Sequence, residues 1–299
     1  MPFCSGSLLS LRAGNYTARV APSAGGRLAS LDWTDNERKV ALLVPWDEKP
    51  FEPDAWPKAG AFPMIPFANR LPPDGIFFDG KQVSPLHGPN GFAQHGLAHR
   101  REWQLRESGE DFALLQLEHR TDSNWPWNFT ATQSFRLSAQ GLLLTISVLN
   151  NSPETMPLSI GWHPYHPIES NVAAESLKLK ASFRHELDLE GRALETTASP
   201  TFQMSAGETA AFSGWNGSVL LSSGGDGNIV ISCESTTQLV LHAMPEAGYL
   251  CVEPVSLLPG HLSQGLHKSG ITPTSNASLQ SGASMSLTWH CAWQAPSQC

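Results

Sequence analysis

The sequence predicts an all-β protein built as a large antiparallel β-sandwich or barrel. Two observations carry this prediction. Apolar and polar residues alternate with period two in many segments, as they do in half-buried strands, whereas helical periodicity is nearly absent. Glycine and proline, 25 and 23 of the 299 residues, also recur throughout the chain. Many closely spaced strands joined by glycine and proline turns are typical of sandwiches.

The expected strands are the segments in which the alternation is regular. They cover residues 112–119, 129–137, 142–149, 177–183, 229–233, 239–244, 249–255 and 285–293. Turn signals such as Asp79-Gly80 and the glycine-rich segment 224–227 separate strands. Two stretches rich in proline and glycine, 46–69 and 255–277, are expected to be ordered loops. Such long loops in a compact domain are commonly functional.

The chain is expected to fold as a single domain over residues 1–299. It contains no internal repeat, no low-complexity tract and no shift of composition that marks a boundary. Sandwiches and barrels of more than two hundred residues often form one unit. With 40% apolar and 15% charged residues, the composition is that of a globular protein with a sizeable core.

The charge balance indicates which partners to expect. A net charge of −8 and a pI near 5.7, without a cluster of Lys and Arg, argue against nucleic acid and against an anionic membrane surface. A neutral or weakly charged small molecule fits better. Residues 1–12 lack a basic start and a sustained apolar stretch, and no run approaches the roughly twenty apolar residues of a membrane helix. We therefore expect a cytoplasmic protein.

Five scattered cysteines without a C-x-x-C pair indicate reduced, mostly buried thiols rather than a disulfide framework. The chain also lacks a G-x-S-x-G nucleophile elbow and a Walker-type loop. These absences argue against serine-nucleophile and nucleotide chemistry.

The first candidate acid–base group is His163. If residues 159–166 form a strand that runs into a turn at Pro164, then Gly161 and His163 share one face and Trp162 lies on the other. Small residues upstream on the His163 face leave open space beside the imidazole, as a pocket requires. A histidine satisfied within the core is the alternative, and the pattern leaves both readings open.

The second candidate is Glu253. In a strand it shares a face with Tyr249, Cys251 and Val255, which is more apolar than a solvated carboxylate prefers. Partial burial raises the pKa of a carboxylate towards the range that is useful for proton transfer. The alternative is a glutamate with its charge in solvent, because Pro254 marks the end of a strand.

Arg70 follows Asn69 in an apolar, proline-rich loop. A planar guanidinium donates to several oxygens of one ligand at once, although pairing with a carboxylate to hold a loop is its more common use.

The histidine spacings are weak evidence for a metal. His95 and His99 are four residues apart, as zinc ligands on a helix are, but Gly96 and its surroundings do not favour a helix. His163 and His166 are separated by Pro164, which is again poor ligand spacing. We therefore expect no metal site.

Four motifs, in this order along the chain, resemble those of the aldose 1-epimerase (galactose mutarotase) family. A glycine-containing segment at 24–31 precedes them. The motifs are Pro66-Phe67-Ala68-Asn69-Arg70, His95-Gly96-Leu97 with Trp103 downstream, Gly161-Trp162-His163-Pro164-Tyr165 and Cys251-Val252-Glu253-Pro254-Val255. Each motif is weak alone, and the ordered set is strong.

The resemblance implies a large antiparallel β-sandwich of the galactose mutarotase type, with a shallow sugar cleft across one sheet. It implies that Glu253 takes the proton of the anomeric hydroxyl while His163 gives one to the ring oxygen. The ring then opens, the C1–C2 bond rotates, and the ring closes to the other anomer. Arg70 and His95 would hold sugar hydroxyls with support from Asn69. No cofactor is implied, and the expected partner is a monosaccharide, bound by a monomer or homodimer.

One departure from the family pattern bears on the activity. The family usually carries an aspartate that binds sugar hydroxyls before a late strand, whereas residues 208–215 contain none, and Glu208 is the nearest substitute. A non-catalytic sugar-binding protein on the same fold is therefore an alternative to the epimerase. A glycoside hydrolase needs two facing carboxylates, and only Glu253 has a suitable setting in the sequence.

Overall fold

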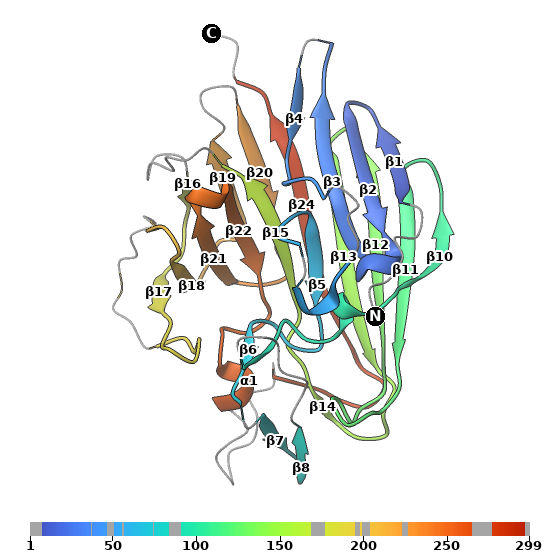
Figure 1. Cartoon of the computed structure of the whole chain (residues 1–299), viewed down its shortest axis with the longest axis vertical. Helices are drawn as coiled ribbons and strands as arrows, with labels where there is room; N and C mark the ends of the chain where they lie inside the picture. Colours follow the sequence, from blue (N-terminus) through green and yellow to red (C-terminus); the bar gives the residue numbers. More distant parts are fainter. Residues whose placement is uncertain are drawn as a thin grey trace.

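The structure is a computed structural model, and it is organised around two antiparallel sheets. It describes residues 8–36, 38–46, 51–55, 57–73, 75–83, 91–168, 177–194, 198, 204–222, 227–264 and 277–296. Figure 1 shows the two sheets packed face to face with their strands running in nearly the same direction, as in an aligned β-sandwich.

The first sheet has ten strands. Across the sheet their order is β1 (Leu9–Ala13), β2 (Tyr16–Ala21), β3 (Arg27–Thr34), β5 (Ala61–Met64), β15 (Gly161–Pro167), β22 (Tyr249–Pro254), β21 (Gln238–Met244), β18 (Thr209–Ser213) and β17 (Phe183–Glu186), with β4 (Lys39–Ala41) beside β3.

The second sheet has eight strands. Their order is β10 (Gln104–Ser108), β11 (Phe112–His119), β12 (Phe129–Ser138), β13 (Gly141–Asn150), β24 (Ser284–Gln294), β20 (Asn228–Ser232), β19 (Ser218–Ser222) and β16 (Leu177–Leu179).

Short elements complete the described part of the chain. Three small pairs are β6 (Arg70–Leu71) with β9 (Ala93–Gln94), β7 (Ile76–Phe78) with β8 (Lys81–Val83), and β14 (Met156–Pro157) with β23 (Ser278–Leu279). The helical turns are η1 (Pro22–Ala24), η2 (Pro53–Ala55), η3 (Ala98–Arg100), η5 (Pro245–Ala247) and α1 (His261–Gln264). Among the described residues, no helix is long and apolar enough to span a membrane.

The ten-stranded sheet is buried on both faces at its centre. On the inner face, Trp162 of β15 lies 5.9 Å from Trp289 of β24, ring centre to ring centre, within the core between the sheets. On the outer face, Phe62, Tyr165 and Cys251 belong to a second apolar cluster. As a result every residue of β5 and β22 is buried, and the period-two alternation disappears there.

The predicted all-β antiparallel fold is confirmed, and most predicted strands match those of the structure. The predicted segment 112–119 coincides with β11, and 239–244 falls within β21. The predicted strand at 177–183 is wrong in its middle, because residues 180–182 carry the chain from β16 in one sheet to β17 in the other. Most of segment 224–227 lies outside the described residues.

Two further predictions require correction. The proline-rich stretch 46–69 is not entirely loop, because it contains β5 at the centre of the larger sheet. The strand at 159–166 does not turn at Pro164 but continues to Pro167. Pro164 lies where β15 changes partner, from β5 over residues 161–164 to β22 over residues 165–167. A residue without an N–H is tolerated at such a switch of pairing.

Three cysteines of the described chain, Cys233, Cys251 and Cys291, are buried and outside disulfides, as expected. Cys4 and Cys299 lie outside the described residues. In the stretch 255–277, α1 is present and residues 265–276 lie outside the described part.

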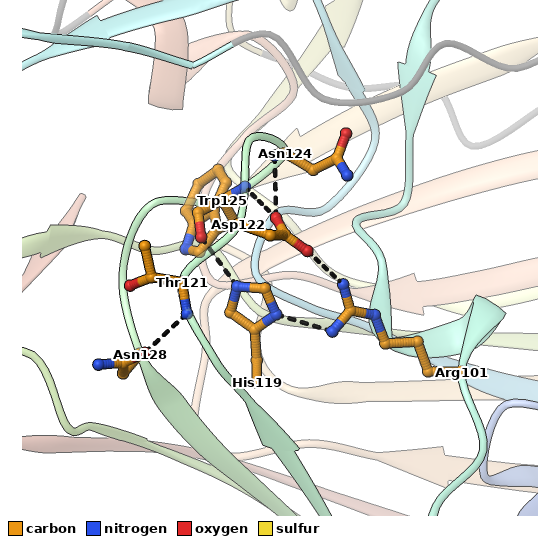
Figure 2. Close-up of polar contacts among 7 residues, drawn as sticks. All are labelled: Arg101, His119, Thr121, Asp122, Asn124, Trp125 and Asn128. Atoms are coloured by element: carbon orange, nitrogen blue, oxygen red, sulfur yellow. Dashed lines mark hydrogen bonds and ion pairs between the residues drawn. The ribbon is translucent and has the colours of Figure 1, made fainter.

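A partly buried polar network fixes the loop between β11 and β12 (Figure 2). His119 donates from Nε2 to the carbonyl of Trp125 at 2.8 Å and accepts at Nδ1 from Arg101, also at 2.8 Å. Arg101 also donates to Asp122 at 2.9 Å, and Asp122 accepts from the backbone N–H of Trp125. The Trp125 indole packs against Phe67, 6.0 Å between ring centres. The network therefore supports the loop that carries Asn69 and Arg70.

We predict that His166 makes the fold sensitive to acid. Its Nδ1 donates to the carbonyl of Leu42 at 2.8 Å, and burial lowers its pKa from 6.5 to about 4. The unfolded chain then binds more protons than the folded chain between these values, so stability is retained above pH 6.5 and falls towards pH 4. The loss from this residue is about 3 kcal/mol.

Chemical denaturation of wild type and His166→Asn between pH 4 and 7 measures this contribution. Asparagine keeps a donor for Leu42 but does not titrate, so the variant should lose about 3 kcal/mol less than wild type across the range. His290→Asn, on the other sheet, is the control and should follow wild type. Equal pH dependence in wild type and His166→Asn would contradict the assignment.

Candidate active site

A pocket of about 340 Å³ opens on the outer face of the ten-stranded sheet. This volume falls within the range of about 300–1,000 Å³ found for small-molecule sites. The five residues singled out from the sequence all line it: Asn69, Arg70, His95, His163 and Glu253. They come from four separate segments of the chain, so the fold rather than local sequence brings them together.

Strand register produces a row of side chains across the floor of the pocket. Phe62 of β5 pairs with His163 of β15, and the neighbouring pair Leu28–Ala61 puts Arg27 of β3 opposite Phe62. The pairings Tyr165–Cys251 and Gly161–Val255 flank His163 and Glu253 and set these two opposite each other. Arg27, Phe62, His163 and Glu253 thus lie side by side on four neighbouring strands.

A second row lies one step along the same face. Tyr165 pairs with Cys251, Cys251 with His242 of β21, and His242 with Thr209 of β18. The Thr209 hydroxyl and Nδ1 of His242 are 2.8 Å apart, which fixes the orientation of the imidazole at the edge of the pocket.

The Glu253 carboxylate and the His163 imidazole are in direct contact. Oε1 of Glu253 lies 3.4 Å from Nε2 of His163. Both residues are buried, with Glu253 2% exposed and His163 5% exposed. The other polar atom of each group, Oε2 of Glu253 and Nδ1 of His163, has no hydrogen-bond partner among the described residues. Unsatisfied polar atoms at a pocket are commonly completed by a ligand or water.

Burial moves the two pKa values in opposite directions. It raises the pKa of Glu253 to about 8, against the nearby charge of Lys58, which favours the carboxylate. Burial also lowers the pKa of His163 well below its usual value, and the positive charges of His95, Lys58, His242 and Arg27 act in the same direction. At neutral pH the pair therefore holds one proton, on Glu253, beside a neutral imidazole.

The sequence alternatives for these two residues are resolved by their positions. Glu253 is not a solvated glutamate at a strand end, because it is buried at the bottom of the pocket. His163 faces the pocket. The sequence predicted open space on the Gly161 side of the imidazole, and this prediction is wrong. A Cβ added to Gly161 would lie 2.6 Å from Cε of Met64 and 3.1 Å from Cγ1 of Val255, so these side chains fill that side. The imidazole instead packs against both Phe62 and Tyr165, with ring centres 4.6 Å and 4.8 Å away.

Asn69, Arg70 and His95 form one wall of the pocket. The short pair β6–β9 joins Arg70 to Gln94, and the His95 N–H donates to the carbonyl of Asn69 at 2.8 Å. Asn69 and His95 both have φ of 59°, a left-handed conformation that is uncommon outside glycine and concentrated at functional sites. Nδ2 of Asn69 has no hydrogen-bond partner among the described residues.

The turn at residues 188–191 lines the pocket beside Arg70. Asp188 accepts from the backbone N–H and from Nε of Arg192, both at 2.8 Å, and these bonds shape the turn. Gly191 has φ of 78°, and a Cβ there would lie 3.1 Å from Cδ of Arg70. Glycine therefore allows the turn to close against the arginine.

Glu208 does not supply the carboxylate that the family pattern lacks here. It is paired with Arg184 and accepts from the backbone N–H of Ser205 at 2.6 Å, while its neighbour Thr209 lines the pocket. Among the described residues that line the pocket, the carboxylates are Glu253 and Asp188.

His163, Cys251 and Glu253 bring three potential metal-ligand atoms within 4.8 Å of one another. Burial, together with the charge of Glu253, raises the pKa of the Cys251 thiol well above its usual value. Metals bind the thiolate, so a thiol held in its protonated form disfavours ligation. His163 and His166 point to opposite faces of β15. His163 lines the pocket, whereas His166 donates to the carbonyl of Leu42. We interpret the group as an acid–base pair above a buried thiol.

Sequence reasoning missed several residues of the pocket. Lys58, Tyr165, Asp188, Thr209, His242 and Tyr249 also line it. His242 and Tyr249 belong to predicted strands, and Tyr249 shares the face of Glu253, which was the available signal. Lys58 and Asp188 lie outside the motifs, and nothing in their local sequence indicates the pocket.

The fold of this chain is similar to that of solved galactose mutarotase-like proteins. Two solved structures share the fold: a galactose mutarotase-like protein from Clostridium acetobutylicum, with a TM-score of 0.77 over 97% of this chain and 95% of that one, and the GalM/aldose epimerase homologue from C. elegans, with 0.78 over 97% and 99%. Their identities to this chain, 19% and 14%, make this a likeness of fold alone.

The sequence comparison gives the family. The aldose 1-epimerase family model matches residues 7–291, so this chain belongs to the aldose 1-epimerase family. An uncharacterised Escherichia coli K12 protein, YphB, is 28% identical over 255 residues, which cover 77% of this chain and 84% of YphB. The resemblance seen in the four motifs is thereby confirmed.

We predict that the thiol below the pocket is chemically inert. Iodoacetamide reacts with thiolates, so in the native protein at pH 8 the alkylation of Cys251 should be slower by at least ~100-fold than in denaturant. Peptide mass spectrometry resolves Cys251 from Cys233 and Cys291, which are equally buried controls. If native Cys251 is alkylated as fast as the unfolded chain, the account of a buried, protonated thiol is wrong.

Proposed function

We propose that this protein is an aldose 1-epimerase that interconverts the α and β anomers of a free monosaccharide, with Glu253 and His163 as its acid–base pair. The observation that carries the proposal is their 3.4 Å contact at the bottom of a pocket, with Oε2 and Nδ1 unpartnered. Ring opening of a sugar needs one group to take a proton and another to give one, which this pair supplies.

The proposed reaction balances within the pair. Glu253, as carboxylate, takes the proton from the anomeric hydroxyl, the C1–O5 bond breaks, and His163 gives its proton to O5. The product is the open-chain aldehyde with one proton on Glu253 and a neutral imidazole. Rotation about C1–C2 and the reverse transfers then close the ring to the other anomer.

The shifted pKa values place the proton of the pair on Glu253, so the pair must transfer it to His163 when sugar binds. The short contact between Oε1 and Nε2 makes this an internal transfer that needs no proton from solvent. The anomeric hydroxyl, donating to Glu253, and the charge of Lys58 both favour the carboxylate. We propose that substrate binding in this way converts the pair to its reactive form, with Glu253 as carboxylate and His163 protonated.

The walls of the pocket offer groups for the remaining hydroxyls. We assign Arg70 and His95, supported by Asn69, to one side of the sugar. We also assign Asp188 to a sugar hydroxyl, in the role the family gives to an aspartate elsewhere. A carboxylate oxygen accepts two hydrogen bonds, and Oδ2 of Asp188 receives one, from Arg192. The acceptor capacity of Asp188 is therefore not exhausted by the turn.

Anomer exchange tests the proposal directly. NMR of purified protein with α-glucose or α-galactose should show equilibration faster than the spontaneous reaction. Glu253→Gln removes the base and should lower kcat/KM by about 10²- to 10⁴-fold, as for other general bases. Glu246→Gln, an exposed glutamate in η5 just before the same strand, is the matched control and should behave as wild type.

Two results would overturn the proposal in different ways. Wild-type rates in Glu253→Gln would remove Glu253 from the mechanism. Saturable sugar binding without exchange above background, across a panel of aldoses, would instead favour a non-catalytic sugar-binding protein on this fold.

We predict that kcat/KM depends on pH through the single proton that Glu253 and His163 share. Because the pKa of Glu253 is raised to about 8, the free enzyme loses this proton above that pH, and kcat/KM should fall about tenfold per unit. Since the pKa of His163 is lowered, activity should persist below pH 6.5. Exchange rates from pH 5 to 10, corrected for spontaneous mutarotation, measure both limbs. A profile that is flat to pH 10, or one that declines between pH 8 and 6, would contradict this assignment.

A further inference from the structure

Arg27 is buried in a manner that calls for an explanation. The residue is 0% exposed, and no carboxylate of the described residues pairs with it. Its Nη1 donates to the carbonyls of Ala59 and Pro57, while Nε and Nη2 have no hydrogen-bond partner in the described part of the chain. Burying an unpaired charge is costly, so such residues are usually kept for a function.

Aromatic rings rather than anions surround the Arg27 guanidinium. Its central carbon lies 5.0 Å from the ring centre of Phe62 and 5.8 Å from that of Phe51. The ring of Phe62 is in turn stacked on the His163 imidazole, with ring centres 4.6 Å apart and an interplanar angle of 20°. In the row across β3, β5 and β15, Phe62 lies between the two, so Arg27 stands behind His163 with one ring in between.

This column is screened poorly by solvent. Arg27 and Phe62 are fully buried, and the groups face each other through apolar material rather than water. A positive charge at such a distance in a low-dielectric environment acts on the protonation of an imidazole. The carbonyls that Arg27 holds also lie on either side of Lys58, a residue at the pocket. Arg27 therefore acts on two parts of the site at once.

We propose that Arg27 is a positioning residue of the active site: its buried charge, held behind His163 through Phe62, makes the imidazolium give up its proton readily to the sugar, and its bonds to Pro57 and Ala59 hold Lys58 at the pocket. The inference rests on the proposed function for its catalytic meaning. The electrostatic coupling between Arg27 and His163 stands independently of turnover.

Other titratable groups also face His163, and the test has to separate Arg27 from them. They come from every neighbouring element: Glu253 and Cys251 on β22, His242 on β21, His95 after β9, Tyr165 on β15, Lys58 before β5 and, against Phe62, His99 on η3. A substitution at Arg27 leaves the chemical identity of all of them unchanged.

The experiment compares Arg27→Gln and Arg27→Lys with wild type. Glutamine removes the charge but keeps a donor for the Ala59 carbonyl, whereas lysine keeps the charge. In Arg27→Gln the acid limb of the pH profile of anomer exchange, which His163 sets, should move to higher pH by up to about one unit, because loss of a nearby positive charge favours proton binding. Arg27→Lys should restore most of the wild-type profile. Arg106→Met, which removes an exposed charge from β10, should leave the profile unchanged.

NMR titration of the His163 ring separates this inference from the proposed function. The signal is assigned by its absence in His163→Asn, and it should titrate at higher pH in Arg27→Gln than in wild type even if the protein shows no turnover. In wild type, the Arg27 Nε resonance should follow the same titration, which provides a test that does not depend on a variant folding. Unchanged titration in Arg27→Gln, or an Arg27 Nε signal insensitive to the protonation of His163, would overturn the proposal.

Discussion

The site depends on the antiparallel register of β3, β5, β15 and β22. Side chains alternate between the two faces of a strand, so a slip of one residue in β15 would turn His163 into the core and Trp162 into the pocket. The register is held from both faces, by Trp162 against Trp289 within the sandwich and by Phe62 and Tyr165 against His163 outside it. Core packing therefore determines the distance between the acid and the base.

The same double burial explains the unusual electrostatics. A sheet with one face in water would leave Glu253 and His163 solvated, with ordinary pKa values. Here the outer face is covered as well, so burial raises one pKa and lowers the other, and several polar atoms remain unpartnered. These atoms cost stability in the empty protein. Local departures from satisfied packing are expected where a protein binds its ligand, because the ligand completes them.

Strands buried on one face could be predicted from the sequence, whereas a strand buried on both faces, β5, could not. The strands β11, β12 and β13 have one face in the core and one towards solvent, so their alternation was readable and their bounds were predicted closely. The strand β5, buried on both faces and containing Pro63, shows no alternation and was missed. Glu253 and His163 were identified because their motifs resemble a family, whereas Asp188 and Lys58 reach the pocket only through the fold. Arg27 gave no signal of its burial, because the strand β3 that it begins also contains the polar residues Ser30 and Asp32.

A pair that shares one proton suits a reversible reaction in a buried site. Ring opening and ring closure use the same two groups with their roles exchanged, so neither group should be a much stronger acid than the other once sugar is bound. Without sugar, the pKa of Glu253 is raised and that of His163 is lowered, so the proton lies on Glu253. The interactions that bind the sugar must therefore offset part of this difference. In the proposed mechanism, binding energy is used to move a proton from Oε1 of Glu253 to Nε2 of His163, atoms that lie 3.4 Å apart, and only a sugar that presents its anomeric hydroxyl to Glu253 can do so. Discrimination among ligands and activation of the base are then the same event.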